Sequence, residues 1–190
     1  MFETVTLADL VTPFVEQIVA KRVEVYNEFS LQHEFGFFLR TQFPADKVQF
    51  ERNVDFFKFD KTFSFVKREI DISVFSADPM RRKWAIELKF PRNGQYPEQM
   101  FSFCRDIVFV EQLKAAGFSH AGLLIFADDH LFWSGRTDGI YGFFRGRAPL
   151  HGAVRKPTGA RDVELTIRGS YHVEWANVAE RVRFAAVEVV

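Results

Sequence analysis

Three side chains near the middle of the chain have types and spacing suited to phosphate chemistry. Asp71 lies in the segment REIDISVF, and Glu87 and Lys89 lie in KWAIELKF. Both segments alternate apolar and polar residues, as strands with one buried face do. All three side chains fall on the polar side of that alternation. If the two strands pair, Asp71, Glu87 and Lys89 converge on one face of a sheet.

Such a convergence suits the hydrolysis of phosphodiester bonds. Two neighbouring carboxylates repel each other unless a cation lies between them, and a hard divalent ion with oxygen ligands resolves the repulsion. The ion can polarise a phosphoryl group and lower the pKa of a bound water. A lysine beside it can position that water or stabilise charge that builds on the phosphate. We therefore expect Mg²⁺ at Asp71 and Glu87, with Mn²⁺ as a substitute.

The order of these elements resembles the PD-(D/E)XK nuclease superfamily. Asp71 is followed by Glu87-Leu88-Lys89 on the next strand, then by a loop and a long helix. Glu69 and Ile70 stand where the family name has proline before the aspartate, and the resemblance covers residues 28–127. It implies an α/β fold of the restriction-endonuclease type, with a central mixed β-sheet flanked by helices.

The resemblance also assigns roles. It implies that Asp71 and Glu87 bind the metal, with the Leu88 carbonyl as a further ligand, and that Lys89 acts on the attacking water. A glutamate on the helix before the strands would complete the site. Glu34 in LQHEFGFF fits that place because it shares a helical stripe with apolar residues. Glu28 is the alternative.

Candidate substrate contacts lie after the motif. Gln99 opens the following helix, where RecB-like members of the superfamily have a glutamine, although an ordinary surface glutamine explains it equally well. Residues 136–168 hold seven Lys or Arg against three acids, so this segment is a candidate nucleic-acid groove. The alternative is that this segment is a solvated loop whose charges make no specific contacts. The candidate contacts there are Arg145, Arg147, Arg155 and Lys156.

The elements that must position these residues follow from periodicity and punctuation. Helices are expected over residues 7–23, from a Ser30 cap to Phe43, and from Pro97 to Gly117. Strands are expected at KVQFERNV with DFFKFDKTFSF as a hairpin partner, at the two motif segments, and at AGLLIFA, HLFW, VELTIRG, YHVEW and RVRFAAVEVV. The segment from residue 135 to about 163 reads as loop.

Length and composition limit the remaining possibilities. The 190 residues, 47% of them apolar, suit a single nuclease-like domain over residues 1–190. Its core would span about 28–134, with a basic loop and C-terminal strands over 135–190. The net charge of zero counts against a general nucleic-acid coating protein. A lone Cys104 allows no intrachain disulfide, and with no signal peptide or membrane span expected, the default location is cytoplasmic.

These observations favour a Mg²⁺-dependent nuclease that hydrolyses nucleic acid, and DNA is preferred over RNA as its substrate. No membrane partner is expected, and a homodimer is compatible with the sequence. The first alternative is a catalytically inactive nuclease-fold module that binds nucleic acid or protein. A structural or assembly protein is the second alternative, because the charge is neutral and Phe occurs 24 times. Divalent-ion binding at Asp71 and Glu87 discriminates among the three.

Overall fold

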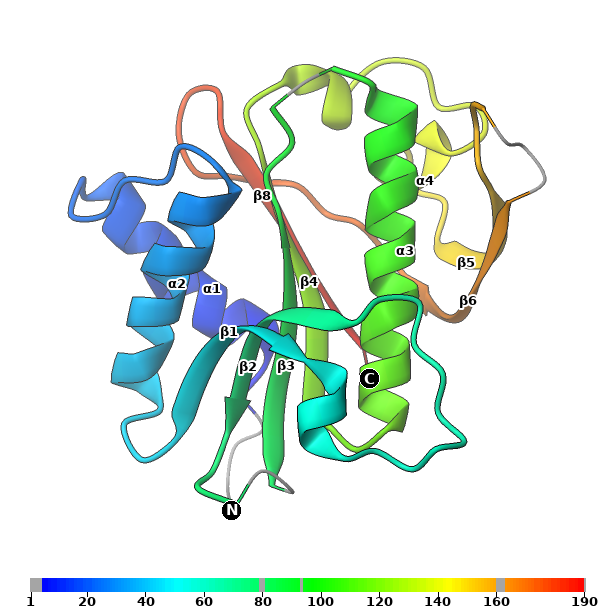
Figure 1. The fold of residues 1–190 in the computed structure, drawn as a ribbon. Helices are drawn as coiled ribbons and strands as arrows, with labels where there is room; N and C mark the ends of the chain where they lie inside the picture. Colours follow the sequence, from blue (N-terminus) through cyan, green and yellow to red (C-terminus); the bar gives the residue numbers. More distant parts are fainter. Residues whose placement is uncertain (1–4, 79–80, 93, 160–162, 190) are drawn as a thin grey trace.

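A mixed β-sheet forms the centre of the computed structural model, which describes residues 5–78, 81–92, 94–159 and 163–189. Within these residues the sheet has six strands in the order β1-β2-β3-β4-β8-β7 (Figure 1). β3 and β4 are parallel, whereas the other neighbouring strands are antiparallel. The strands are β1 Lys47–Asn53, β2 Glu69–Phe75, β3 Arg82–Lys89, β4 His120–Ala127, β7 Ala176–Asn177 and β8 Arg183–Val189. The predicted α/β class with a mixed sheet and flanking helices is therefore confirmed.

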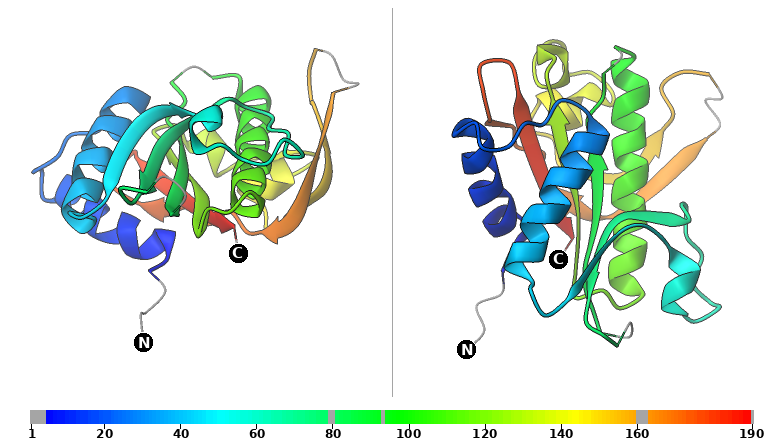
Figure 2. Two further views of the ribbon diagram at one scale, coloured as in Figure 1. Left: turned by 60° about the horizontal axis from the view of Figure 1, so that its bottom comes forward. Right: turned by 60° about the vertical axis from the view of Figure 1, so that its left-hand side comes forward.

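Helices cover both faces of this sheet. α1 (Leu7–Val19) and α2 (Glu28–Gln42) pack on one face, and α3 (Tyr96–Ala115) packs on the other (Figures 1 and 2). The start of α2 is fixed by a capping box in which Asn27 and Ser30 satisfy each other's backbone N–H groups. Ser30, expected as the cap, is thus the third residue inside the helix. This start places Glu28 in the first turn.

The parallel pair β3–β4 requires a crossover, and α3 supplies it. Pro97 lies in the first turn of α3, where its missing N–H leaves no helical bond unmade. The helix then runs back along the sheet and presents apolar residues to β4 and β8. The chain therefore passes from the end of β3, through a short loop, directly into a helix that lies over the same face as Glu87 and Lys89.

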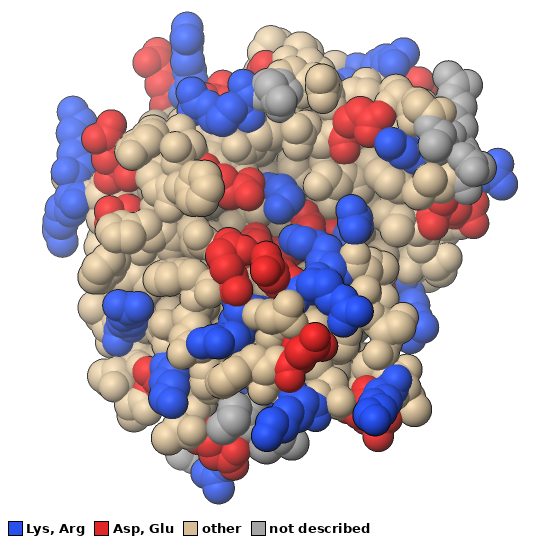
Figure 3. Space-filling view, viewed as in Figure 1, with Lys and Arg blue, Asp and Glu red and all other residues tan. Residues whose placement is uncertain are grey.

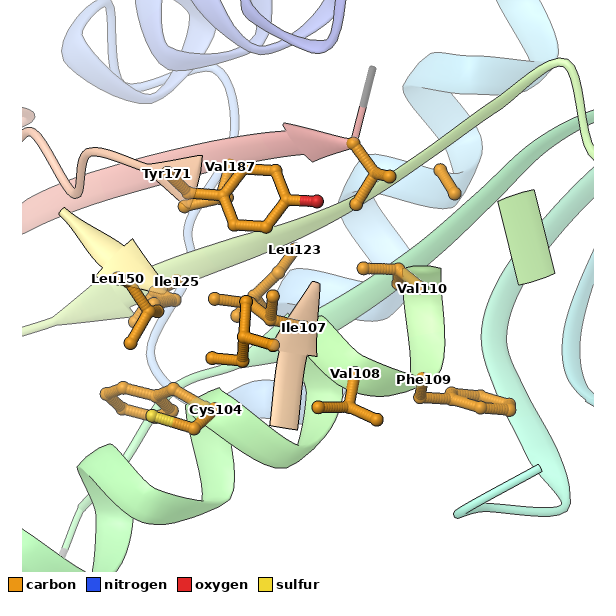
Figure 4. Close-up of a cluster of buried hydrophobic side chains, with 14 of the residues drawn as sticks. Cys104, Ile107, Val108, Phe109, Val110, Leu123, Ile125, Leu150, Tyr171 and Val187 are labelled. Carbon is orange, nitrogen blue, oxygen red and sulfur yellow. The ribbon is translucent and has the colours of Figure 1, made fainter. Parts of the chain in front are cut away.

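Two buried clusters fill the space on either side of the sheet. On the side of α1 and α2, Trp84, Ile86 and Leu88 of β3 pack with helix residues such as Phe14 and Phe35. On the opposite side, α3 packs between the sheet and the outer strands, as Figure 4 shows for residues around Ile107 and Leu123. The alternation along β3 therefore sends its apolar side chains into one core and leaves Glu87 facing the other.

The C-terminal third contains more structure than the loop predicted for it. α4 (Tyr141–Arg145) and β5 (Leu150–Arg155) form within it, and β5 pairs with β6 (Glu164–Tyr171) as a separate two-stranded sheet on the outer side of α3. Glu111 of α3 anchors this hairpin by accepting hydrogen bonds from the backbone N–H groups of Arg168 and Gly169 (3.0 and 2.6 Å) and from the Tyr171 hydroxyl (2.9 Å). Long-range packing therefore orders a segment whose local sequence favours turns.

Three predicted strands are wrong. YHVEW is irregular after Tyr171, the last residue of β6, and the other two form turn structure for a related reason. The segment expected to pair with β1 forms the 3₁₀ helix η1 (Val54–Phe57) and a loop, and HLFW forms η2 (His130–Phe132). Short apolar runs are ambiguous between strand and turn structure when their burial comes from side chains packing against a distant core. In the described ranges, no helix combines the length and apolar character needed to cross a membrane.

Candidate functional site

The candidate site lies where β2 and β3 stop pairing as a regular ladder. Their register runs from Phe75↔Arg82 to Ile72↔Ile86, and Asp71 and Glu87 come next on the two strands. There the backbone N–H of Asp71 donates to Glu87 Oε1 (3.2 Å), and the N–H of Leu88 donates to Asp71 Oδ2 (2.7 Å). Side-chain carboxylates thus accept the backbone hydrogen bonds beyond the last registered pair. Both acids are held in place on the face toward α3.

A third carboxylate and a second lysine complete the buried centre. Asp106 of α3 is 2% exposed, and Lys67 lies on the loop that enters β2. The Lys67 ammonium group pairs with Glu87 Oε2 and also lies 3.0 Å from Asp106 Oδ1. Since the Glu87 side chain is 0% exposed, its charge depends on this pairing. The loop before β2 therefore places Lys67 between Glu87 of β3 and Asp106 of α3.

Lys89 connects this centre to α2. Its Nζ donates to the Leu88 carbonyl (2.8 Å) and lies 3.2 Å from Asp106 Oδ2 and 3.9 Å from Glu28 Oε1. Glu28 also accepts a hydrogen bond from the backbone N–H of Phe90 (3.1 Å). An acid in the first helical turn is favoured by the helix dipole. The ammonium group of Lys89 is thereby held at a fixed position beside the Leu88 carbonyl.

The edge strand contributes through an irregularity. Glu51 adopts a left-handed backbone conformation (φ 47°), between the Phe50↔Ile72 and Arg52↔Ile70 pairs of an otherwise unchanged β1–β2 register. The Gln32 amide of α2 donates to Glu51 Oε1 (2.6 Å) and to the Asp71 carbonyl (3.0 Å). A left-handed conformation is uncommon for a residue other than glycine, and such conformations are concentrated at functional sites. Gln32 and Glu51 thus fix α2 against the strand that carries Asp71.

An open cavity of about 590 Å³ lies beside this centre, and the buried Glu87 and Asp106 are not among the residues that line it. Figure 3 shows acidic and basic side chains side by side near the middle of this face of the molecule. The volume falls in the range of about 300–1,000 Å³ that is usual for small-molecule sites. Its lining residues are Glu28, Phe29, Gln32, Glu51, Lys67, Arg68, Glu69, Asp71, Leu88, Lys89 and Arg105.

Burial and the crowding of like charges raise the pKa values of Asp71 and Glu87. Burial raises the pKa of Asp71 to about 6, against the lowering effect of Lys89 and Lys67. For Glu87, burial and then the charges of Asp71 and Asp106 raise the pKa well above its ordinary value. Both carboxylates therefore hold their negative charge at a considerable free-energy cost in the absence of further cations.

The pKa values of the two lysines are raised as well, but for a lysine a raised pKa favours the charged form. Burial alone would lower the pKa of Lys67, but the carboxylates of Glu87 and Asp106 outweigh it and raise that pKa. Lys89 behaves likewise, with Asp106, Asp71 and Glu28 raising its pKa. With all groups ionised, three buried carboxylates face two ammonium groups, which leaves one uncompensated negative charge before Glu28 is counted. The centre is therefore suited to receiving positive charge.

The structure brings together the three residues with which the sequence argument began. Asp71, Glu87 and Lys89 lie on one face of adjoining strands, as the alternation predicted. Leu88 presents its carbonyl to Lys89 at the same place. The geometric part of the hypothesis is confirmed; the chemical roles stay a prediction.

The placement of Glu34 is wrong, and Glu28 takes its position. Glu34 lies outside the cavity lining, with its side chain 34% exposed and paired with neighbouring His33 at 3.4 Å. Six residues separate Glu28 from Glu34, which is about 9 Å along a helix axis. The cavity adjoins the first turns of α2, so a glutamate in the middle of the helix is too far along the sheet to reach it.

The predicted substrate contacts are not brought into the cavity lining. Gln99 is half-buried in the second turn of α3 and does not line the cavity. Arg145 is committed to structure: its guanidinium donates to the Leu131 carbonyl (2.7 Å) and the Arg136 carbonyl (3.3 Å), and stacks on Tyr141. These contacts hold the loop in place, so the prediction that Arg145 contacts substrate is not supported.

Arg155 and Lys156 lie at the β5–β6 hairpin on the outer side of α3. Arg155 pairs with Glu164 across the β5–β6 hairpin (2.9 Å), and Lys156 lies 3.7 Å from Glu98. Arg147 is exposed just before β5. Arg161, which adds to the charge count of the segment, lies outside the described residues. None of these described cations lines the cavity at Asp71.

The candidate site residues drawn from the sequence include neither Lys67 nor Asp106. A signal for Asp106 was present: it lies three residues after Phe103 and four before Val110, within the apolar stripe of α3. An acid in a buried stripe requires a partner. Lys67 lies in an irregular segment without periodicity, so no comparable pattern identifies it.

The donor set offers oxygen ligands for a hard cation. Carboxylate oxygens of Asp71 and Glu87 and the Leu88 carbonyl are the ligand types that Mg²⁺ prefers. Across the described residues, no group of three or more His, Cys, Asp or Glu is arranged as a ready metal site. The Lys67 ammonium group lies between Glu87 and Asp106 and compensates part of their negative charge.

Comparison of the chain with protein-family models, with curated proteins and with solved structures finds no match in any of the three.

Proposed function

We propose that this chain is a Mg²⁺-dependent nuclease of the PD-(D/E)XK type, with a restriction-endonuclease-like fold, that hydrolyses phosphodiester bonds of nucleic acid, DNA in preference to RNA. One observation carries the proposal: two carboxylates and a lysine are fixed at the diverging ends of two antiparallel strands, beside an open cavity. The excess negative charge of this centre supports an additional cation as part of the working state.

In this proposal each residue of the site has its own role. Asp71 and Glu87 would hold the divalent ion together with the Leu88 carbonyl, and the bound ion would supply Lewis acidity toward the phosphate and a lowered pKa for water. Lys89, fixed by the Leu88 carbonyl and Asp106, would orient the attacking water and offset charge on the phosphate oxygens. Glu28, in contact with Lys89, would keep that ammonium group in position.

The test is cleavage of labelled single-stranded and duplex DNA by the purified chain in Mg²⁺, with EDTA as the negative control. We expect Asp71→Asn and Lys89→Met to lower the rate by about 10²–10⁴-fold. Glu34→Gln is the matched control, since Glu34 lies outside the cavity. Cleavage that survives EDTA, or that all variants retain, would reject the proposal and indicate a contaminant.

A non-catalytic nucleic-acid-binding module is the second candidate, and Lys67 is the observation that favours it. An ammonium group between Glu87 and Asp106 offsets part of the negative charge of the centre without any metal ion. In that case Mn²⁺ should not bind at Asp71, whereas the nuclease proposal requires that it does. Isothermal titration of Mn²⁺ into the wild type and Asp71→Asn separates the two candidates.

A further inference from the structure

Phe29 is the most exposed aromatic residue in the described part of the chain. It lies in the first turn of α2, is 81% exposed, and lines the same cavity as Asp71 and Lys89. Aromatic side chains are usual in the lining of ligand-binding cavities. The position of Phe29 therefore calls for a ligand with an apolar face.

The other exposed phenylalanines have neighbours that account for them. Phe37 is 50% exposed but contacts the His33 ring at 4.7 Å and the Arg40 guanidinium at 5.5 Å. Phe56 packs on Phe57, with centroids 5.2 Å apart, and Phe63 faces Phe65 at 6.3 Å. Within the described part of the chain, Phe29 has no such aromatic or cationic partner. Its ring face is open to a ligand.

Cations line the same cavity. Arg68 has a side chain 73% exposed, and Arg105 is anchored by one hydrogen bond to the Val66 carbonyl (2.8 Å) while remaining exposed. Lys67 and Lys89 lie deeper in the same lining. An aromatic ring with arginine and lysine side chains in one cavity is the combination that binds single strands, because rings stack on bases and cations contact phosphates.

The size and form of the cavity restrict the ligand further. At about 590 Å³ it can admit one nucleotide unit but no double helix. Inside a duplex both faces of every base are covered by its neighbours, so a protein ring can stack only on an unpaired base. We propose that Phe29 is a stacking platform for an unpaired base next to the reacting phosphate, which makes single-stranded nucleic acid the substrate class of this site. This inference rests on the proposed nuclease function for the identity of the reacting phosphate.

The test measures binding without cleavage, in EDTA and low salt, by fluorescence anisotropy. The probes are a labelled oligo(dT), an abasic strand of equal length, and a closed duplex hairpin. We expect Phe29→Ala to weaken oligo(dT) binding by about 10-fold and Phe29→Trp to preserve it. Binding to the abasic strand and to the hairpin should not change. Phe37→Ala, another exposed phenylalanine of α2 but outside the cavity, is the matched control and should bind as the wild type does.

Three results would overturn the inference: no oligo(dT) binding by the wild type, equal losses of Phe29→Ala on oligo(dT) and abasic strands, or a wild-type dimer that Phe29→Ala converts to a monomer in sedimentation. The last would mean that a second copy covers Phe29. Because this assay measures binding without metal, it can reject the stacking inference without rejecting the nuclease proposal, and the cleavage assay can do the reverse. A chain that never cleaves can still pass this test, and an active nuclease can fail it.

Discussion

Replacing Lys67 with methionine would test the charge balance of the buried centre. The Lys67 ammonium group pairs with Glu87, whose side chain is 0% exposed, and lies 3.0 Å from Asp106. Methionine keeps much of the length of the side chain but removes its charge. The variant centre would contain three carboxylates against one ammonium group, that of Lys89, so the excess negative charge rises from one to two.

The expected magnitude follows from this geometry. Removing one partner of a buried ion pair costs about 3–5 kcal/mol, and the 24% exposure of the Lys67 side chain places the expected loss at the lower end, about 3 kcal/mol. For a chain of this length, 1 kcal/mol corresponds to about 2–4 °C in melting temperature, so the melting temperature should fall by about 6–12 °C. The loss should be measured by thermal denaturation in EDTA near pH 8.

Divalent ions should then reverse the loss. A cation that binds only the folded state at 100 times its dissociation constant stabilises by about 2.7 kcal/mol. Because Lys67→Met has more uncompensated charge, Mg²⁺ or Mn²⁺ should raise its melting temperature more than that of the wild type. Lys83→Met is the matched control: it breaks the Lys83–Asp46 pair (2.6 Å) at a different position, and Mg²⁺ should not restore its stability.

The charge argument fails on either of two results. One is a Lys67→Met variant that loses less than about 1 kcal/mol in EDTA, below the range for a buried pair. The other is an equal Mg²⁺ response in Lys67→Met, Lys83→Met and the wild type. The first would mean that Glu87 does not need Lys67 for compensation, and the second that the ion binds elsewhere.

Two further predictions concern neighbouring carboxylates. The pKa of Asp71 is raised in the folded state from 3.8 to about 6, so its favourable contribution is complete below pH 3.8 and is lost as pH rises to about 6. In EDTA, the unfolding free energy of the wild type relative to Asp71→Asn should therefore fall by about 3 kcal/mol over that window; a difference that stays constant with pH would contradict the buried, ionised carboxylate. Glu28→Gln should lower cleavage by about 10–100-fold because Glu28 contacts Lys89, whereas Glu34→Gln should leave it unchanged; equal effects of the two substitutions would contradict the exchange of Glu34 for Glu28.

The sequence alone was sufficient for the strand-borne part of the site. In a strand, side chains alternate strictly between faces, so a short segment already determines which residues share a side. The apolar pattern of WAIELKF therefore predicted that Glu87 and Lys89 leave the α1–α2 core. The same rule placed Asp71 with them once the two segments were taken as neighbours. The α/β class was implied by the resemblance that the motif and the order of its flanking elements carry.

Only the tertiary structure decided which residues from other elements reach that face. The position of a helix along the sheet, set by the packing of α2 on the core, selected Glu28 over Glu34. The placement of α3 over the strand ends brought Asp106 into contact with Lys67 and Lys89. Long-range carbonyl contacts turned Arg145 into a structural residue. Periodicity describes one element at a time, whereas the axial offset between elements and the path of an irregular loop depend on the packing of the whole chain.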